Sequence, residues 1–361
     1  MQGINFKRVA LMMGAVVLSV SSFATEVEET PSADGAKNEN VIPTVQIGTS
    51  KIRFMGYGQG AYTATWQDDQ TSNAMEVQRF ILMADAQIND KISFWLMYDI
   101  ANSKLHEYYA QYAFSPALKV RVGQYKQPFT LESLLPPTVI SNIGMDESVS
   151  YMAGIGADDP CFGFGRVGRD VGIMLTGDAA MCDGKPLLNY SIGVFNGAGM
   201  NQKENNNQKD VIGMLNVMPF KNTKFSTSFI LGTAKAQADS RYGKFVTGDN
   251  YKRNRFALGA EHKNSVVNLR SEAMWGNDGG VKSMGWYANA EFHLCKRLDL
   301  VANYDYLKRN MDVDDSYTNN YIAGLQYWVY RQCCIRSQYV RKEPKLSAST
   351  DMWVTQFQIA F

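Results

Sequence analysis

Apolar and polar residues alternate with a period of two along most of the chain. The segment "QRFILMADAQI" at residues 78–88 places Phe80 and Leu82 on one parity and Arg79 and Asp85 on the other. Successive side chains of a β-strand point to opposite faces, so this alternation predicts strands with one apolar face and one polar face.

The alternating segments recur through to the last residue, and we count about sixteen of them, each roughly ten residues long. The connections between them also alternate in length. Short turns such as Asn89–Asp90 and Arg331–Gln332 are separated by generally longer polar loops such as "NGAGMNQKENNNQKD", with "NSK" at residues 102–104 as a short exception. Short turns on one rim and longer loops on the other are typical of transmembrane β-barrels.

The chain ends in "MWVTQFQIAF", which places Trp353, Phe357, Ile359 and Phe361 on one parity. An apolar strand with an uncovered edge promotes aggregation, so a neighbouring strand must pair with it. We expect this last strand to pair with the first strand and to close the sheet into a barrel that has no free edge.

The segregation of charge identifies the face that meets lipid. A basic side chain facing the bilayer midplane costs about 2–4 kcal/mol, and an acidic one somewhat less. Nearly all charged residues fall on the parity opposite to the aromatic and aliphatic residues, so the apolar parity is expected to face lipid. A soluble β-sandwich or propeller is the alternative, but its core would be rich in Val, Ile and Leu, whereas this parity is rich in Tyr, Phe, Ala and Gly.

The first 24 residues resemble a secretory signal peptide, because Lys7 and Arg8 precede a short apolar run that ends in small residues before a cleavage site. Residues 25–45 are polar and acidic and are predicted to form a flexible leader. The barrel is then expected to span residues 46–361. Together with the barrel pattern, export through a cleaved signal peptide predicts a location in the bacterial outer membrane.

Charge and cysteine content exclude several classes of function. The formal charge is +1, and it falls to −1 when residues 1–24 are removed, since they contain Lys7 and Arg8 and no acidic residue. No nucleic-acid partner is therefore expected. The five cysteines match no zinc-binding spacing, and no metal or cofactor is predicted; Cys295 and Cys333 or Cys334 could form a disulfide.

A family resemblance appears at residues 105–131, "LHEYYAQYAFSPALKVRVGQYKQPFTL", and again at residues 168–178, "GRDVGIMLTGD". The first segment resembles a strand, a short turn and a second strand that leads into the third loop of the phosphate-selective porin O and P family. The second segment resembles the strand that follows this loop. The specific similarity covers about residues 76–178, and beyond them only the pattern is shared.

The resemblance implies a sixteen-stranded outer-membrane barrel, usually a homotrimer, whose third loop folds inward and narrows the pore. In this sequence the third loop would run from about residue 128 to 165, and its length favours packing back into a wide lumen. The expected partners are outer-membrane lipids and small hydrophilic solutes or ions.

Selection of anions requires fixed positive charge at a constriction, because that charge replaces the hydration that the anion loses. The basic residues expected to line the bore are Arg53, Arg79, Arg121, Lys126, Arg270 and Arg336. The resemblance implies that the first four lie on strands that the family uses for its anion path. Any of these arginines could instead pair with an inward residue such as Asp99 or Glu107 and only stiffen the wall.

The third loop contains acidic residues, among them Glu132, Asp146 and Glu147, and no lysine or arginine between Gln127 and Gly165. A basic ladder on the loop is therefore absent, and we expect passive, weakly selective diffusion of small solutes, including anions such as phosphate. The alternative is a non-conducting structural or adhesive barrel. No catalytic residue is predicted, because none of the three histidines lies in a motif that positions a serine.

Overall fold

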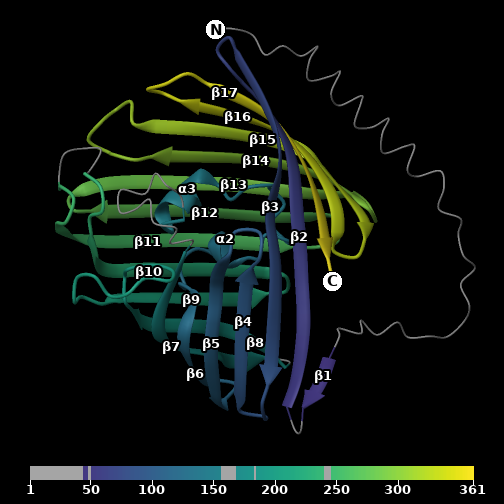
Figure 1. Ribbon diagram of the computed structural model, residues 1–361, viewed down its shortest axis with the longest axis vertical. Helices are drawn as coiled ribbons and strands as arrows, with labels where there is room; N and C mark the ends of the chain where they lie inside the picture. The colour runs from purple at the N-terminus through teal and green to yellow at the C-terminus, as the bar shows by residue number, and fades with distance from the viewer. Residues whose placement is uncertain (1–43, 48–49, 156–167, 183, 240–244) are drawn as a thin grey trace, which may run out of the picture. The chain divides into compact units, whose positions relative to one another are not determined.

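A computed structural model describes residues 44–47, 50–155, 168–182, 184–239 and 245–361 (Figure 1). The predicted signal peptide and nearly all of the predicted leader lie outside these residues. The same is true of residues 156–167, which contain the end of the predicted third loop and Cys161.

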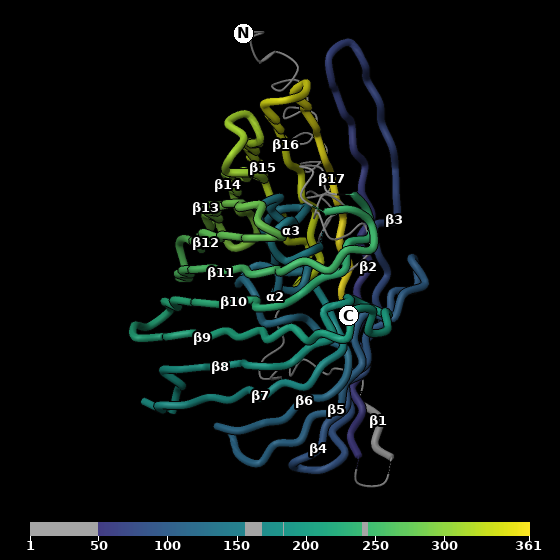
Figure 2. The backbone as a smooth tube through the Cα atoms, turned by 90° about the vertical axis from the view of Figure 1, so that its left-hand side faces the viewer, coloured from purple at the N-terminus to yellow at the C-terminus, as the bar shows by residue number. Residues whose placement is uncertain are grey.

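Within the described residues, seventeen strands form one antiparallel sheet (Figures 1 and 2). The bounds of the first nine are β1 Thr44–Ile47, β2 Ser50–Gln67, β3 Gln70–Gln87, β4 Ile92–Asp99, β5 Lys104–Ser115, β6 Leu118–Lys126, β7 Arg169–Cys182, β8 Lys185–Phe195 and β9 Asp210–Phe220. The bounds of the others are β10 Thr223–Lys235, β11 Asn250–Lys263, β12 Val267–Asp278, β13 Val281–Cys295, β14 Leu298–Lys308, β15 Tyr317–Tyr330, β16 Cys333–Pro344 and β17 Thr350–Ala360.

The sheet is a closed barrel of sixteen strands, because β2 to β17 each pair with the next strand and β17 pairs with β2. The last residue takes part in the closure: Phe361 and Gly56 exchange backbone hydrogen bonds of 3.0 and 3.1 Å. The predicted strand number is therefore confirmed. The short strand β1 pairs only with the first residues of β2 and begins inside the predicted leader.

The two rims differ in the length of their connections. One rim has only short turns, such as the one between Cys295 and Leu298, and the other carries the connections 127–168, 196–209 and 236–249. The second rim also has two tight turns, at 68–69 and 279–280. In the latter, Gly279 and Gly280 have φ values of 60° and 91°, which other residues adopt only with strain.

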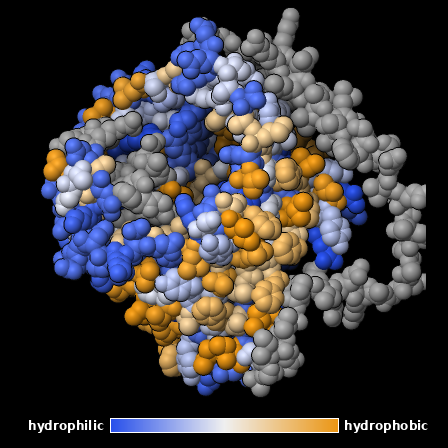
Figure 3. All heavy atoms as spheres, viewed as in Figure 1, coloured by the Kyte–Doolittle hydropathy of each residue, from blue (hydrophilic) through white to orange (hydrophobic). Residues whose placement is uncertain are grey.

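The two faces of the sheet differ as the alternation predicts. In β17, Phe357 and Ile359 are each 57% exposed, whereas Gln356 and Gln358 are 1% and 2% exposed. Figure 3 shows apolar side chains gathered on the outer surface of the sheet, while polar and charged side chains of the opposite parity are buried inside. A face of exposed Phe, Leu, Val and Tyr suits lipid, and it is energetically unfavourable in water.

Two short helices interrupt the long connection between β6 and β7: α2 (Leu131–Leu134) and α3 (Glu147–Met152). The hydroxyl of Thr130 caps α2 by accepting a hydrogen bond from the Ser133 N–H. No helix among the described residues is long and apolar enough to cross a bilayer.

The cost of a charge on the outer face should depend on its depth. Leu258 lies within β11 and is 46% exposed, whereas Val266 lies in the turn after β11 and is 64% exposed. We expect Leu258→Arg to lower the free energy of unfolding by about 2–4 kcal/mol and Val266→Arg by at most about 1 kcal/mol. Urea unfolding in lipid vesicles measures both values, and equal costs at the two positions would contradict a lipid-facing outer surface.

Candidate functional site

The connection between β6 and β7 is anchored to the inner face of β12 and β14. The Glu272 carboxylate accepts hydrogen bonds from the backbone N–H groups of Leu131 (2.5 Å) and Glu132 (3.0 Å) at the start of α2. The Asp305 carboxylate does the same for Glu147 (3.0 Å) and Ser148 at the start of α3. Carboxylates at these positions satisfy amides that the short helices leave unpaired.

The same connection also contacts β16, two strands beyond β14 in the sheet. The Gln338 amide accepts a hydrogen bond from the Ile143 N–H (2.9 Å) and donates one to the Ser141 carbonyl (2.7 Å). The Arg336 guanidinium donates to the carbonyls of Pro137 (3.2 Å) and Thr138 (3.1 Å). Anchors on β12, β14 and β16 thus fix the segment between α2 and α3 across a wide arc of the wall.

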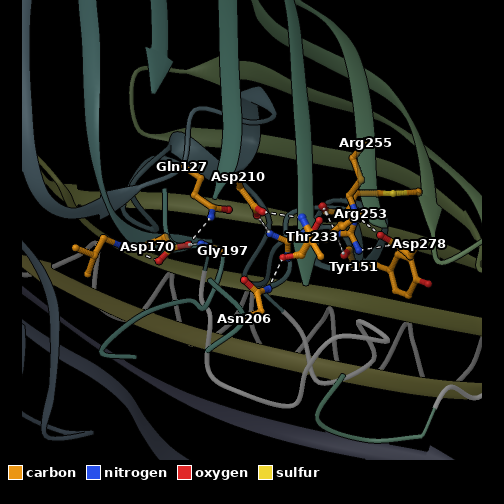
Figure 4. A network of polar contacts seen from close by, with 12 residues as sticks. Gln127, Tyr151, Asp170, Gly197, Asn206, Asp210, Thr233, Arg253, Arg255 and Asp278 are labelled. Atoms are coloured by element: carbon orange, nitrogen blue, oxygen red, sulfur yellow. Dashed lines mark hydrogen bonds and ion pairs between the residues drawn. The ribbon is translucent and has the colours of Figure 1, made fainter. Parts of the chain in front are cut away.

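Buried ion pairs continue this network toward the rim that carries the long loops (Figure 4). Arg255 pairs with Asp278 at 2.8 Å and also donates to the carbonyls of Tyr151 and Met152, which fixes the end of α3. Nearby, Arg253 pairs with Asp210 at 2.5 Å. Breaking a buried pair leaves an uncompensated charge and costs about 3–5 kcal/mol, so these contacts make the loop anchorage rigid.

A similar set of hydrogen bonds holds the loop at residues 196–209. The Asp170 carboxylate accepts hydrogen bonds from the Gly197 N–H (2.7 Å) and from the side chain of Gln127 (3.3 Å), which directly follows β6 (Figure 4). The Asn206 side chain donates to the Thr233 carbonyl at 2.6 Å. Two neighbouring loops of this rim are therefore linked to the inner wall by one polar network.

The three acidic residues predicted for the loop all contact the wall or each other. Glu147 forms ion pairs with Arg309 and with Lys342, the latter at 2.9 Å. Glu132 and Asp146 are 1% and 2% exposed, and the Glu132 carboxylate accepts a hydrogen bond from the Asp146 N–H at 3.4 Å. These three carboxylates are consequently compensated or buried, and they contribute little negative charge to open solvent.

The environment of Glu132 and Asp146 favours their protonated forms. Burial raises the pKa of Glu132 to about 7. Burial, the neighbouring Glu132 and Asp305 raise the pKa of Asp146 well above its ordinary value. One oxygen of each carboxyl, Oε2 of Glu132 and Oδ2 of Asp146, lacks a hydrogen-bond donor among the described residues. Two buried carboxyls in contact can share one proton, because both cannot be ionised at low cost.

Four of the six predicted basic residues either form ion pairs with carboxylates of the wall or donate hydrogen bonds to carbonyls of the loop. Arg53, near the rim of short turns, pairs with Asp85, and Arg270 pairs with Glu261 at 2.9 Å. Arg336 is 1% exposed and bonds to loop carbonyls, and the Lys126 ammonium donates to the carbonyls of Ser133 (2.8 Å) and Leu135 (2.7 Å). Arg53 and Arg270 thus pair with carboxylates of the wall, while Arg336 and Lys126 hold the loop.

Arg79 and Arg121 differ from the other four, since neither forms an ion pair with any described residue. Arg79 is half-buried on β3, hydrogen-bonds to Tyr57, and lies close enough to Lys126 and Arg336 for their charges to interact. Arg121 stacks over the ring of Tyr109 at 4.1 Å and donates to Gln111. Stacking orients this guanidinium but leaves its charge uncompensated.

The structure adds basic residues that sequence analysis missed. Arg169 pairs with Glu107 at 2.8 Å, and its charge acts on Lys126 and His106. Arg255 and Arg309 hold α3. The inward parity of Arg255 was readable from the alternation of β11, but Arg169 shares the parity of the exposed Ile173 and Leu175 on β7. The groups that these arginines contact lie far away in the sequence, so no local signal marked them.

Two cavities lie beside the loop. One of about 530 Å³ is bordered by α3 and by side chains of β15 to β17, among them Asn320, Gln338 and Lys342. The other, of about 660 Å³, lies toward the rim of short turns and is bordered by Val139 and Arg336. Both have polar side chains in their lining, as a path for hydrophilic solutes requires.

The structure also shows the state of four cysteines and one group of three potential metal ligands. Cys182, Cys295, Cys333 and Cys334 all have free thiols, so the disulfide considered from the sequence is not formed. Glu291, His293 and Asp299 place one potential ligand atom each within 4.8 Å of the others. This group has none of the cysteine and histidine spacings of zinc sites, so the sequence alone did not reveal it.

Comparison with known families confirms the resemblance at residues 105–131, whereas residues 168–178 lie outside the matched range. The family model of phosphate-selective porin O and P matches residues 51–141, which include β2 to β6 and α2. No curated protein matches the chain.

Solved structures share the fold at low sequence identity. The anion-selective porin from Comamonas acidovorans superposes with a TM-score of 0.64 and 13% identity, covering 86% of this chain and 100% of that one. Pseudomonas putida OprB gives a TM-score of 0.66 with 9% identity, covering 86% and 94%. The trimer form of Vibrio cholerae OmpT gives 0.61 with 11% identity, covering 86% and 99%.

The carboxyl pair of Glu132 and Asp146 should make stability depend on pH. Because the pKa of Glu132 is raised from 4.5 to about 7, its stabilising contribution is fully present below pH 4.5 and is lost as the pH rises through about 7. We expect wild-type protein in detergent to lose about 2 kcal/mol of unfolding free energy between pH 5 and pH 8 through this group. Glu132→Gln should remove most of that loss.

The matched control is Glu204→Gln, which changes an acidic residue of another loop that pairs with Lys209. Urea unfolding at the two pH values measures the loss for each protein. An undiminished loss in Glu132→Gln would show that this carboxyl does not carry the dependence.

Proposed function

We propose that this chain, whose residues 51–141 match the phosphate-selective porin O and P family, is an outer-membrane porin. It forms a water-filled channel through which small hydrophilic solutes diffuse passively. The observation that carries the proposal is the closed sixteen-strand sheet with an exposed apolar outer face and a charged inner face. Such a barrel is solvated by lipid outside and by water inside.

The third loop, predicted at residues 128–165, narrows this channel. Support comes from its described part, which bonds to inward side chains along one arc of the barrel wall: Glu272 on β12, Asp305 on β14, and Arg336 and Gln338 on β16. A rigid loop held in this way sets the minimum width of the path, and solutes pass beside it through the two cavities.

The channel favours anions, including phosphate, with weak selectivity. The loop acids Glu132, Asp146 and Glu147 are compensated or buried, so their negative charge acts weakly on a passing solute. Arg79 and Arg121 keep uncompensated positive charge on the inner wall. This balance favours anions at the constriction without a loop-borne basic ladder.

The remaining features follow from the same assignment. Residues 1–24 act as a signal peptide that is cleaved on export, and residues 25–45 form a leader. The barrel assembles as a homotrimer, as the trimer form of Vibrio cholerae OmpT does. No catalytic group or cofactor is part of the proposal.

The principal experiment is electrical. Purified protein inserted into a planar lipid bilayer should produce discrete conductance steps, because a polar bore passes hydrated ions. The same preparation must be shown to be folded by a shift of its electrophoretic mobility on heating. A folded and inserted protein that produces no steps would reject the porin and leave the non-conducting structural or adhesive barrel.

Selectivity should depend on the two uncompensated arginines. We expect Arg79→Ala and Arg121→Ala each to shift the reversal potential under a salt gradient toward cations, because each removes positive charge from the bore. The measurement is best made near 0.1 M salt, where the Debye length is about 10 Å.

Arg341→Ala is the matched control, since Arg341 pairs with Glu343 and Asp351 and lies on the outward parity of β16. It removes the same charge but not from the bore. If the reversal potential shifts no more for Arg79→Ala and Arg121→Ala than for Arg341→Ala, then both arginines have only a structural role in the wall.

A further inference from the structure

Three potential metal ligands converge on the inner face of the β13–β14 hairpin, next to the rim of short turns. Glu291 and His293 are two residues apart on β13 and therefore point to the same face. Asp299 on β14 lies directly opposite His293 in the strand register. The imidazole and the two carboxylates bring one ligand atom each within 4.8 Å of one another.

The spacing of these atoms is close to that of ligands on one ion. His293 Nδ1 lies 2.8 Å from Asp299 Oδ1. Two ligands at zinc bond lengths of about 2.0–2.2 Å in a tetrahedral arrangement lie about 3.3 Å apart. Opening the present contact by a few tenths of an ångström would admit the ion between these two atoms, which rotation about the side-chain bonds of His293 can supply.

Asp299 is oriented by groups that leave one of its oxygens for the ion. Its Oδ2 accepts hydrogen bonds from Trp328 Nε1 at 2.6 Å and from Gln326 Nε2 at 3.2 Å, and Oδ1 faces His293. Asp299 is 3% exposed. Donors that fix one carboxylate oxygen in this way are the usual supports of a metal ligand, because they hold the other oxygen in place.

The charge of the group also calls for a cation. Glu291 and Asp299 are both buried, and within the described chain neither lies at ion-pair distance from a lysine or arginine. Two carboxylates held together in a buried setting repel each other, and a divalent ion would compensate both.

The surroundings restrict which ion fits. The group borders the 660 Å³ cavity, so water can complete the coordination shell, and the thiol of Cys295 borders the same cavity. Lys263, Arg270, Lys296 and Arg336 border it too, and their positive charge opposes any cation held by charge alone. This favours a metal that forms strong bonds to imidazole, such as Zn²⁺, over Ca²⁺ or Mg²⁺, which prefer oxygen ligands.

We propose that Glu291, His293 and Asp299 form a binding site for a divalent transition metal of the Zn²⁺ class at the short-turn mouth of the barrel. The bound ion would bring positive charge to the wall of the cavity beneath the loop. The site does not depend on conduction, so it can be tested on folded protein in detergent whether or not the barrel is a porin.

The test is a titration of metal-free, folded full-length barrel with Zn²⁺, measured by isothermal calorimetry and by competition with a colour-changing chelator. Wild-type protein should bind one Zn²⁺ per chain at this site, and His293→Ala should weaken that binding by at least about tenfold. Trp328→Phe, which removes a hydrogen bond to Asp299 and leaves all three ligands present, should weaken it by a smaller factor. Excess Ca²⁺ or Mg²⁺ should not displace the metal.

His262→Ala is the control, because His262 lies near the same rim but on the outward parity of β11, where it hydrogen-bonds to Thr223. Binding should be unchanged in this variant, and heat-shifted electrophoretic mobility confirms that each variant is folded. Absence of Zn²⁺ binding by wild-type protein overturns the proposal, as does equal binding by His293→Ala. Loss of binding in Cys295→Ser together with retention in His293→Ala would overturn it by assigning the ion to the thiol.

Discussion

The pairing of β17 with β2 is the interaction on which the rest of the structure depends. Inside hydrocarbon no water is present to satisfy a free strand edge, so a sheet can lie there only if it closes on itself. The terminal Phe361 completes the closure through its backbone bonds with Gly56. Closure in turn defines an inside and an outside, and the period-two alternation of every strand then delivers apolar side chains to one and charged side chains to the other.

Once the inner face is defined, its charges have two uses that compete for the same residues. Glu272, Asp305 and Arg336 are directed at backbone groups of the long connection, whose short helices have amides and carbonyls left over. A charge used in this way is desolvated and compensated, so it stabilises the loop and acts weakly on a passing solute. In the proposed channel, the electrostatic potential of the bore is therefore set by the smaller number of charged residues that do not contact the loop.

The sequence predicted the number of strands and the two faces well, because alternation is a local property that each segment displays on its own. The loop anchors could not be predicted, since Leu131 and its acceptor Glu272 are 141 residues apart and Arg336 and Thr138 are 198 apart. The group at Glu291, His293 and Asp299 is different. Its members are close in sequence and share the inward parity of one hairpin, so a search by strand parity, instead of by zinc-finger spacing, would have found it.

The acidic loop illustrates why a count of charges misjudges a pore. In the sequence, five basic wall residues and Lys126 stand against a loop whose charged residues are all acidic, which predicts weak selectivity. In the structure Glu147 is paired with Arg309 and Lys342, and the carboxyls of Glu132 and Asp146 are buried together where burial favours protonation. These charges are thus compensated within the wall and the loop, and in the proposed channel a solute meets only the charged groups that remain unpaired. Arg79 and Arg121, which form no ion pairs among the described residues, add positive charge beside the loop of the proposed channel, whereas Glu291 and Asp299 add acidic groups near the rim of short turns. Unpaired groups of both signs are consistent with the weak selectivity that we propose.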